Sequence, residues 1–192
     1  MRRIALLIVV AGFSVAPIAH AQDHAEAGIF AEYFKLQQTR SNFAGIGGRA
    51  AVNVVKNVQI EAEMSYDFNQ VFTEGFANTS GGTITTQNSN LKILHGLFGP
   101  KIQTRGPVHL YATVKGGFAD FRFDPVPASF NTFASTVSNL RTNNVDAAFY
   151  PGVGVEAFFG PIGLRAEVGD EIIFVGGPHH NLRITFGPQV RF

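Results

Sequence analysis

Apolar and polar residues alternate without exception between Val58 and Phe68. The apolar positions are Val58, Ile60, Ala62, Met64, Tyr66 and Phe68, and the polar positions between them are Gln59, Glu61, Glu63, Ser65 and Asp67. Successive side chains of a β-strand point to opposite faces, so this stretch predicts a strand with one apolar and one polar face. The final segment, Asn181–Phe192, shows the same alternation.

The alternation recurs, less strictly, in six further segments: Ala27–Leu36, Ala44–Val54, Leu91–Gln103, Val108–Phe118, Val145–Phe159 and Leu164–Phe174. Together with Val58–Phe68 and Asn181–Phe192, these segments predict eight strands of roughly ten residues. This is the length that a tilted strand needs to cross a bilayer. The third of these six carries apolar Ile93 and Leu97 among its polar positions. The last segment carries Asp170 on its apolar face near mid-depth, where an acid is unfavourable. A bulge beside Gly169 would turn Asp170 inward, but it would then turn Glu171 outward.

The connections between the predicted strands alternate in length. Tight turns are predicted at Lys56-Asn57, at Arg105–Pro107 and at Gly160–Gly163, which contain turn-forming residues. The other connections are mostly longer: Gln37–Asn42, Gln70–Asn90, Arg122–Asn144 and Gly176–His180. Short turns at one end and longer loops at the other are typical of a bacterial outer-membrane barrel.

Alternation alone does not say which face points inward. In a soluble barrel or sandwich the apolar face forms the core, and that alternative stays open. The apolar face here runs the whole length of each predicted strand, and a sheet surrounded by hydrocarbon must close on itself to pair its edge amides. The sequence therefore predicts an all-β, eight-stranded antiparallel up-and-down transmembrane β-barrel with its apolar face outward.

With that orientation the polar faces enclose a charged interior. The lumen of an eight-stranded barrel is only wide enough for side chains, and a buried charge without a partner is costly, so we predict a paired network. Its predicted members are Glu32, Arg49, Glu61, Glu63, Lys101, Lys115, Glu156, Arg165, Glu167, Arg183 and Arg191, with Asp67 and Asp146 on the same faces. His95 and His109 also fall on these faces, and we expect them to belong to the network rather than to bind metal.

Outward aromatic residues lie near the predicted strand ends. They are Tyr33, Tyr66, Phe68, Phe98, Phe159, Phe174 and Phe192. These positions fit the aromatic girdles of a membrane barrel, although the chain contains no Trp.

The N-terminus has the three parts of an export signal in order. Met1-Arg2-Arg3 is basic, Ile4–Val15 is apolar, and Ala19-His20-Ala21 matches a small-residue cleavage site. We therefore predict a cleaved signal peptide over residues 1–21 and a barrel domain over residues 22–192. Removal of the signal leaves 13 basic residues against 14 acidic ones, which provides no basic surface for nucleic acid. The absence of Cys excludes disulfides and thiolate metal sites.

The sequence resembles the small OmpA-like and OmpX-like outer-membrane barrels. The likeness is carried by the alternating Asn181–Phe192 with its terminal Phe, by Gly45-x-Gly47-Gly48-x-Ala50, and by Val58-x-Ile60-x-Ala62, and it covers Gly28–Phe192. The resemblance implies that Phe192 is the signal read by the barrel-assembly machinery. It also implies outer-membrane lipid and periplasmic chaperones as partners.

Three functions are compatible with such a barrel. We expect a non-enzymatic structural or surface-display role in the envelope, with loops for adhesion or contact and no cofactor or metal. A narrow ion-conducting pore is the alternative, although eight strands leave little room for one. A lipid A-modifying enzyme is less favoured: His179-His180 lie near Asp170 and Glu171, but Asn181-Leu182 stand where deacylase-like barrels place a Ser.

Overall fold

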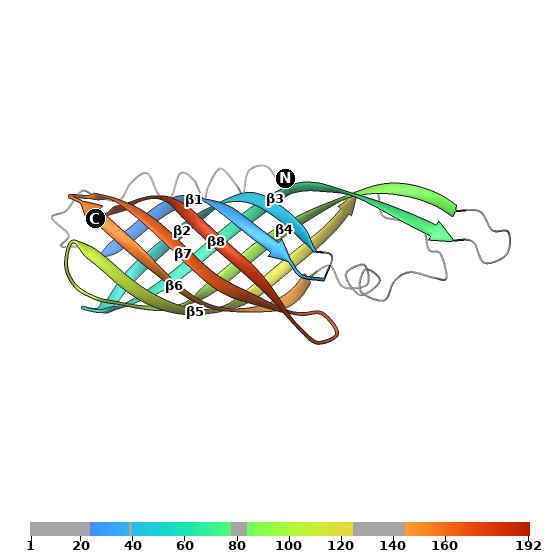
Figure 1. Ribbon diagram of the computed structural model, residues 1–192. Coiled ribbons are helices and arrows are strands. Elements are labelled where there is room, and N and C mark those ends of the chain that lie inside the picture. Colours follow the sequence, from blue (N-terminus) through green and yellow to red (C-terminus); the bar gives the residue numbers. More distant parts are fainter. Residues whose placement is uncertain (1–23, 39, 78–83, 125–144) are drawn as a thin grey trace, which may run out of the picture.

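Eight antiparallel strands close into one barrel in chain order, each pairing with the next and β8 with β1 (Figure 1). The computed structural model describes residues 24–38, 40–77, 84–124 and 145–192. The strands are β1 (Ala25–Leu36), β2 (Ser41–Val55), β3 (Val58–Ala77), β4 (Ile84–Gln103), β5 (Val108–Asp124), β6 (Val145–Phe159), β7 (Ile162–Phe174) and β8 (Pro178–Arg191). Within these ranges, no helix is long and apolar enough to cross a membrane. The predicted signal peptide lies outside the described residues.

The two ends of the barrel differ in their connections. At the turn end, tight turns join β2 to β3, β4 to β5 and β6 to β7, and the C-terminus lies beside the start of β1. There the backbone N–H groups of His24 and Ala25 donate to the carbonyl of Phe192 at 3.0 Å. At the opposite, loop end, β1, β3, β5 and β7 end and β2, β4, β6 and β8 begin. The up-and-down order thus follows the predicted alternation of short and longer connections.

The strand faces divide as the alternation predicts. Apolar side chains of all eight strands point outward, among them Ile29 at 68%, Val153 at 56% and Phe159 at 76% exposure. All seven predicted girdle aromatics lie on this outer face. The polar positions between them point into the barrel, where Glu61, Lys101 and Arg183 are fully buried. An inward apolar core with the charges outside is therefore wrong, and the closed all-β architecture is confirmed.

The connection predicted over Gln70–Asn90 is mostly strand. β3 and β4 continue past the barrel rim as a paired hairpin, from Gln70↔Leu91 to Ala77↔Ile84 (Figure 1). At the base of this hairpin two residues of β3, Phe68 and Asn69, stand opposite one residue of β4, which is a β-bulge. The alternation fades beyond the rim because both faces there lie outside the barrel, so polarity no longer marks the strand.

Asp170 does not lie at mid-depth, and no bulge turns it. The β6–β7 pairing keeps one register through this region, from Gly152↔Gly169 to Phe149↔Ile172. Asp170 stays on the outer face, four residues before the loop-end terminus of β7. Its carboxylate accepts a hydrogen bond from the backbone N–H of Asn181 at 3.0 Å and contacts the His180 ring at 2.5 Å. The acid is tolerated because it lies near the rim and has two partners.

Candidate functional site: the charged barrel interior

The interior of the barrel holds most of the protein's buried charge. Glu26, Glu32, Glu61, Glu63, Asp67, Glu156, Glu167 and Glu171 are buried in its central part, together with Arg49, Lys101, Lys115, Arg165 and Arg183. Asp146 also points inward, toward the loop end, whereas the buried Asp120 shares the outer face with its β4 partner Leu94 and contacts Arg122. Around the central part the described residues thus provide eight carboxylates for five permanent cations.

Arg165 and Lys115 form the middle of the network. Lys115 Nζ lies 2.6 Å from Glu61, 2.8 Å from Glu63 and 3.2 Å from Glu167. The Arg165 guanidinium donates to Glu61 and Glu167, and its Nε donates to the Tyr111 hydroxyl at 2.6 Å. Two cations therefore bind three carboxylates in a space closed to solvent. Such a multiply paired arrangement meets the requirement that buried charges be paired and hydrogen-bonded.

Toward the turn end, Lys101 joins two acids that come from strands far apart in the sequence. Its Nζ lies 2.6 Å from Glu156 and 3.1 Å from Glu26. Gln59 donates a further hydrogen bond to Glu26 at 2.8 Å. Between Lys101 and the turn end, the lumen opens into a cavity of about 670 Å³ that is lined in part by His109.

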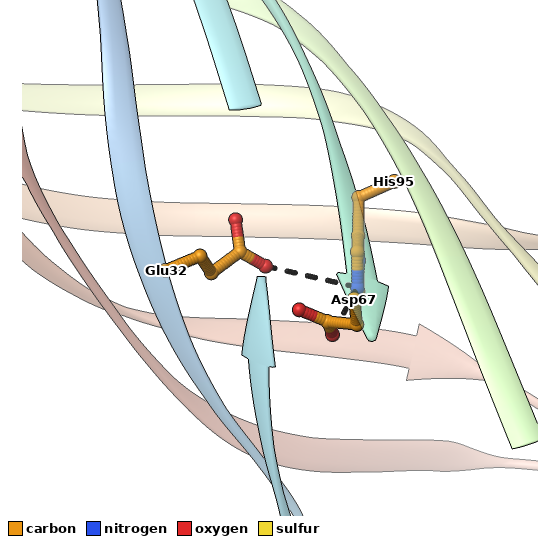
Figure 2. A group of neighbouring side chains, drawn as sticks. All are labelled: Glu32, Asp67 and His95. Carbon is orange, nitrogen blue, oxygen red and sulfur yellow. Dashed lines mark hydrogen bonds and ion pairs between the residues drawn. The ribbon is translucent and has the colours of Figure 1, made fainter. Parts of the chain in front are cut away.

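Toward the loop end, His95 lies among carboxylates from three other strands. Its Nδ1 is 2.7 Å from Glu171 and its Nε2 is 3.1 Å from Asp67 and 3.8 Å from Glu32. Figure 2 shows the Glu32 and Asp67 carboxylates directed toward the same side of the ring. Arg183 supplies the neighbouring positive charge, donating to Glu32 at 2.7 Å and to Glu63 on its other branch.

An apolar cluster fills the lumen between this charged part and the loop end. Its members are Phe34, Leu36, Phe43, Leu91, Ile93, Leu97, Ala119, Phe121, Ala148, Tyr150, Ile173 and Val175, all of them buried. Ile93 and Leu97, which blurred the alternation of β4, keep its inward parity and belong to this cluster. The cluster also contacts the charged part directly, because the Tyr150 ring lies 5.3 Å from Lys115 Nζ and 5.2 Å from the Arg183 guanidinium.

Glycines on neighbouring strands make room for two inward aromatic rings. Tyr111 lies opposite Gly154, where an added Cβ would stand 2.2 Å from the Tyr111 hydroxyl. Phe30 lies opposite Gly47, where a Cβ would stand 2.3 Å from the ring. Guanidinium groups stack on these rings, with Arg165 4.4 Å from the Tyr111 centroid. The Gly45–Ala50 pattern thus has a packing role inside the barrel.

The structure places the predicted network residues as follows. Glu32, Arg49, Glu61, Glu63, Lys101, Lys115, Glu156, Arg165, Glu167 and Arg183 are buried in the lumen. Arg191 lies lower, at the turn end, where its Nε donates to the Gly160 carbonyl and its guanidinium lies over the Phe158 ring. Sequence reasoning missed Glu26 and Glu171 as members. Glu26 precedes the predicted strand Ala27–Leu36. The alternation from Leu164 places Glu171 inward, but the bulge anticipated beside Gly169 obscured this assignment.

The histidine pair near the loop end is divided between the two faces. His180 faces outward and contacts Asp170, whereas the His179 ring lies 3.0 Å from the Val175 carbonyl. Glu171 points into the lumen toward His95. The four residues considered for lipid chemistry therefore do not share one site.

The fold matches that of solved small outer-membrane barrels. Ail, the attachment invasion locus protein of Yersinia pestis, solved with the heparin analogue sucrose octasulfate, aligns with a TM-score of 0.52 at 13% identity over 88% of this chain and 97% of its own. Neisserial surface protein A gives 0.54 at 11% identity, covering 88% and 96%. The N-terminal barrel of Pseudomonas aeruginosa OprF gives 0.51 at 11% identity, covering 89% and 98%. No protein-family model and no curated protein sequence matches the chain.

Proposed function

We propose that this protein is an integral barrel of the bacterial outer membrane, with a structural and surface-display role and no catalytic step. The observation that carries the proposal is the continuous apolar outer face of a sheet without free edges. Exposed large hydrophobic side chains occur on every strand, whereas soluble monomers rarely expose a contiguous apolar patch larger than a few hundred Å². A bilayer core is the solvent that such a surface fits.

The filled lumen supports display rather than transport. Lys115, Arg165 and Arg183 are at most 2% exposed, and the apolar cluster extends from them toward the loop end. An eight-stranded lumen is just wide enough for side chains, whereas barrels of about 16–18 strands enclose a water-filled channel. In planar bilayers we expect no reproducible conductance steps from the refolded protein, and regular steps would establish the narrow-pore alternative instead.

The display role concerns the loop end. Barrels of this type carry short periplasmic turns and longer extracellular loops, so the proposal puts the loop end, with the β3–β4 hairpin, outside the cell. Loops on a rigid scaffold commonly carry binding residues. Ail is described as an attachment protein, and contact or adhesion is the corresponding role proposed here. Deletion of residues 126–143 should abolish any surface binding while leaving the barrel folded.

Membrane integration is tested on the protein as the cell makes it. After expression with the export segment, the chain should remain in the membrane pellet during alkaline carbonate and urea extraction. Extracted into mild detergent, it should migrate differently in SDS gels before and after boiling, because a closed barrel resists cold SDS. Recovery in the soluble fraction, together with identical mobility in both gel lanes, would refute the proposal.

A further inference from the structure

Three carboxylates from three strands meet around one imidazole from a fourth strand, next to the apolar cluster. Glu32 comes from β1, Asp67 from β3, His95 from β4 and Glu171 from β7 (Figure 2 shows the first three). One ligand atom from each of Glu32, Asp67 and His95 lies within 4.8 Å of the others. Each of these four side chains is at most 1% exposed.

Three carboxylate oxygens of this cluster receive no hydrogen bond from the described residues. They are Glu32 Oε1, Asp67 Oδ1 and Glu171 Oε2. Glu32 Oε1 is directed at His95 Nε2, 3.8 Å away, whereas its other oxygen accepts from Arg183. A buried carboxylate oxygen without a partner loses its hydration without replacement. Glu32 Oε1, which has no hydrogen-bond partner among the described residues, is thus directed at the same ring nitrogen that Asp67 Oδ2 approaches to 3.1 Å.

The geometry points to a bound metal: we propose that Glu32, Asp67 and His95 Nε2 coordinate one divalent transition-metal ion of the Zn²⁺ type. Ligands about 2.0–2.1 Å from a tetrahedral ion lie roughly 3.4 Å from one another. The distances from His95 Nε2 to the Asp67 and Glu32 oxygens, 3.1 and 3.8 Å, lie on either side of this value. A small rearrangement of two side chains would thus complete three ligands. This inference concerns a separate site and goes beyond the display function.

Glu171 acts in this arrangement as a positioning residue. Its carboxylate lies 2.7 Å from His95 Nδ1. Metal-binding histidines commonly donate their second ring N–H to a carboxylate, which fixes the tautomer and leaves the other nitrogen free for the ion. The Phe34 ring, at 4.8 Å between centroids, packs edge-on against the imidazole and holds its plane.

The local charge also favours a dication. Glu32, Asp67 and Glu171 carry three negative charges, and Arg183 is the permanent cation that contacts two of them. With a neutral His95 the cluster is left with two negative charges, which one divalent ion neutralises. A proton on His95 would neutralise only one of them. In a dry lumen that difference is large, because Coulomb energies rise as the dielectric constant falls.

The surroundings restrict the kind of ion. Ca²⁺ and Mg²⁺ prefer six or more oxygen ligands, whereas an imidazole with two carboxylates suits Zn²⁺ and its neighbours.

Gly45 lies opposite both Glu32 and Asp67 on β2. An added Cβ at Gly45 would stand 2.3 Å from Asp67 Oδ1, so this position has room for the carboxylate only as glycine.

The test is zinc retention by the mature chain, refolded into detergent with Zn²⁺ or with a chelator. The ion is added during refolding because the apolar cluster covers the site. After passage over chelating resin, the wild-type barrel should hold about one zinc per chain by elemental analysis. X-ray absorption should report one imidazole among its ligands. A wild-type barrel that retains no zinc overturns the proposal and leaves a protonated His95 as the occupant.

Variants assign the zinc to this cluster. Glu32→Gln and Asp67→Asn should lose the retained zinc, and Glu171→Gln should weaken retention by about 10–100-fold. His180→Gln and His109→Gln are matched controls, because they remove a histidine elsewhere, and should retain it. Loss in His180→Gln with retention in Asp67→Asn would assign the zinc to the rim and refute the site. Cold-SDS mobility, recorded for each variant, separates loss of metal from loss of the barrel.

Discussion

Replacing Arg165 by Met tests whether the buried ionic network stabilises the barrel. The guanidinium contacts Glu61 and Glu167, lies 3.2 Å from Glu156, and is 2% exposed. Without it, Lys115 is left as the cation contacting both Glu61 and Glu167. Removing one partner of a buried pair costs about 3–5 kcal/mol. With an m-value of about 2 kcal/mol per M, the urea midpoint should fall by roughly 2 M.

The measurement is equilibrium unfolding in urea of the protein refolded into detergent micelles. Far-UV circular dichroism is the probe, since the chain has no Trp. Arg105→Met is the matched control, because Arg105 is exposed at the turn end, where its guanidinium donates to the Asn57 side chain, and an exposed charged contact contributes about 0–1 kcal/mol. Arg165→Met combined with Glu61→Gln should recover about half of the loss, because one uncompensated carboxylate is removed. The network's role would be refuted if the unfolding free energy of Arg165→Met lay within about 1 kcal/mol of wild type. Strictly additive effects of Arg165→Met and Glu61→Gln would refute it as well.

Three further perturbations test other parts of the structure. Val153→Arg, at the middle of the outer face, should lower the unfolding free energy by about 2–4 kcal/mol in lipid vesicles. Thr104→Arg, at the turn end, should lower it by about 1 kcal/mol or less. Equal losses would contradict the bilayer assignment. Gly154→Val should displace Tyr111 and reduce thermal stability, whereas Gly116→Val, with no atom near an added Cβ, should not. Phe192→Ala should reduce assembly in cells without changing refolding in detergent, with Phe186→Ala as the control; equal assembly of both variants would remove the assembly role of Phe192.

The inward and outward faces were predictable because the side-chain period of a strand is two. Once Glu61 and Glu63 are assigned to the lumen, the parity of β3 assigns Ser65 and Asp67 as well. The pairing of strands gives the same result for the others, which explains why ten of the eleven predicted network positions are buried in the lumen. Parity holds wherever the outer face and the lumen differ in polarity, and it gives no information beyond the rim, where β3 and β4 continue as a hairpin.

The partners within the lumen were not predictable from the sequence. Arg183 on β8 pairs with Glu63 on β3, 120 positions away in the chain, and Arg165 on β7 pairs with Glu61. Which residues face each other across a barrel depends on the tilt of the strands and the shear of the sheet. Neither quantity can be read from one strand at a time. The cluster of Glu32, Asp67 and His95 has the same origin, since its members come from three strands.

The charged lumen makes the wrong register costly. A one-residue slip of β8 would turn its inward side chains, Arg183 among them, onto the outer face and bring Ile184 and Phe186 inside. The slip would expose a guanidinium to lipid at about 2–4 kcal/mol and leave Glu32 and Glu63 without their Arg183 contacts. A lumen lined only by aliphatic residues would impose no such penalty, because both faces would then suit hydrocarbon. The Arg183 ion pairs therefore favour the observed register of β8, whatever they add to total stability.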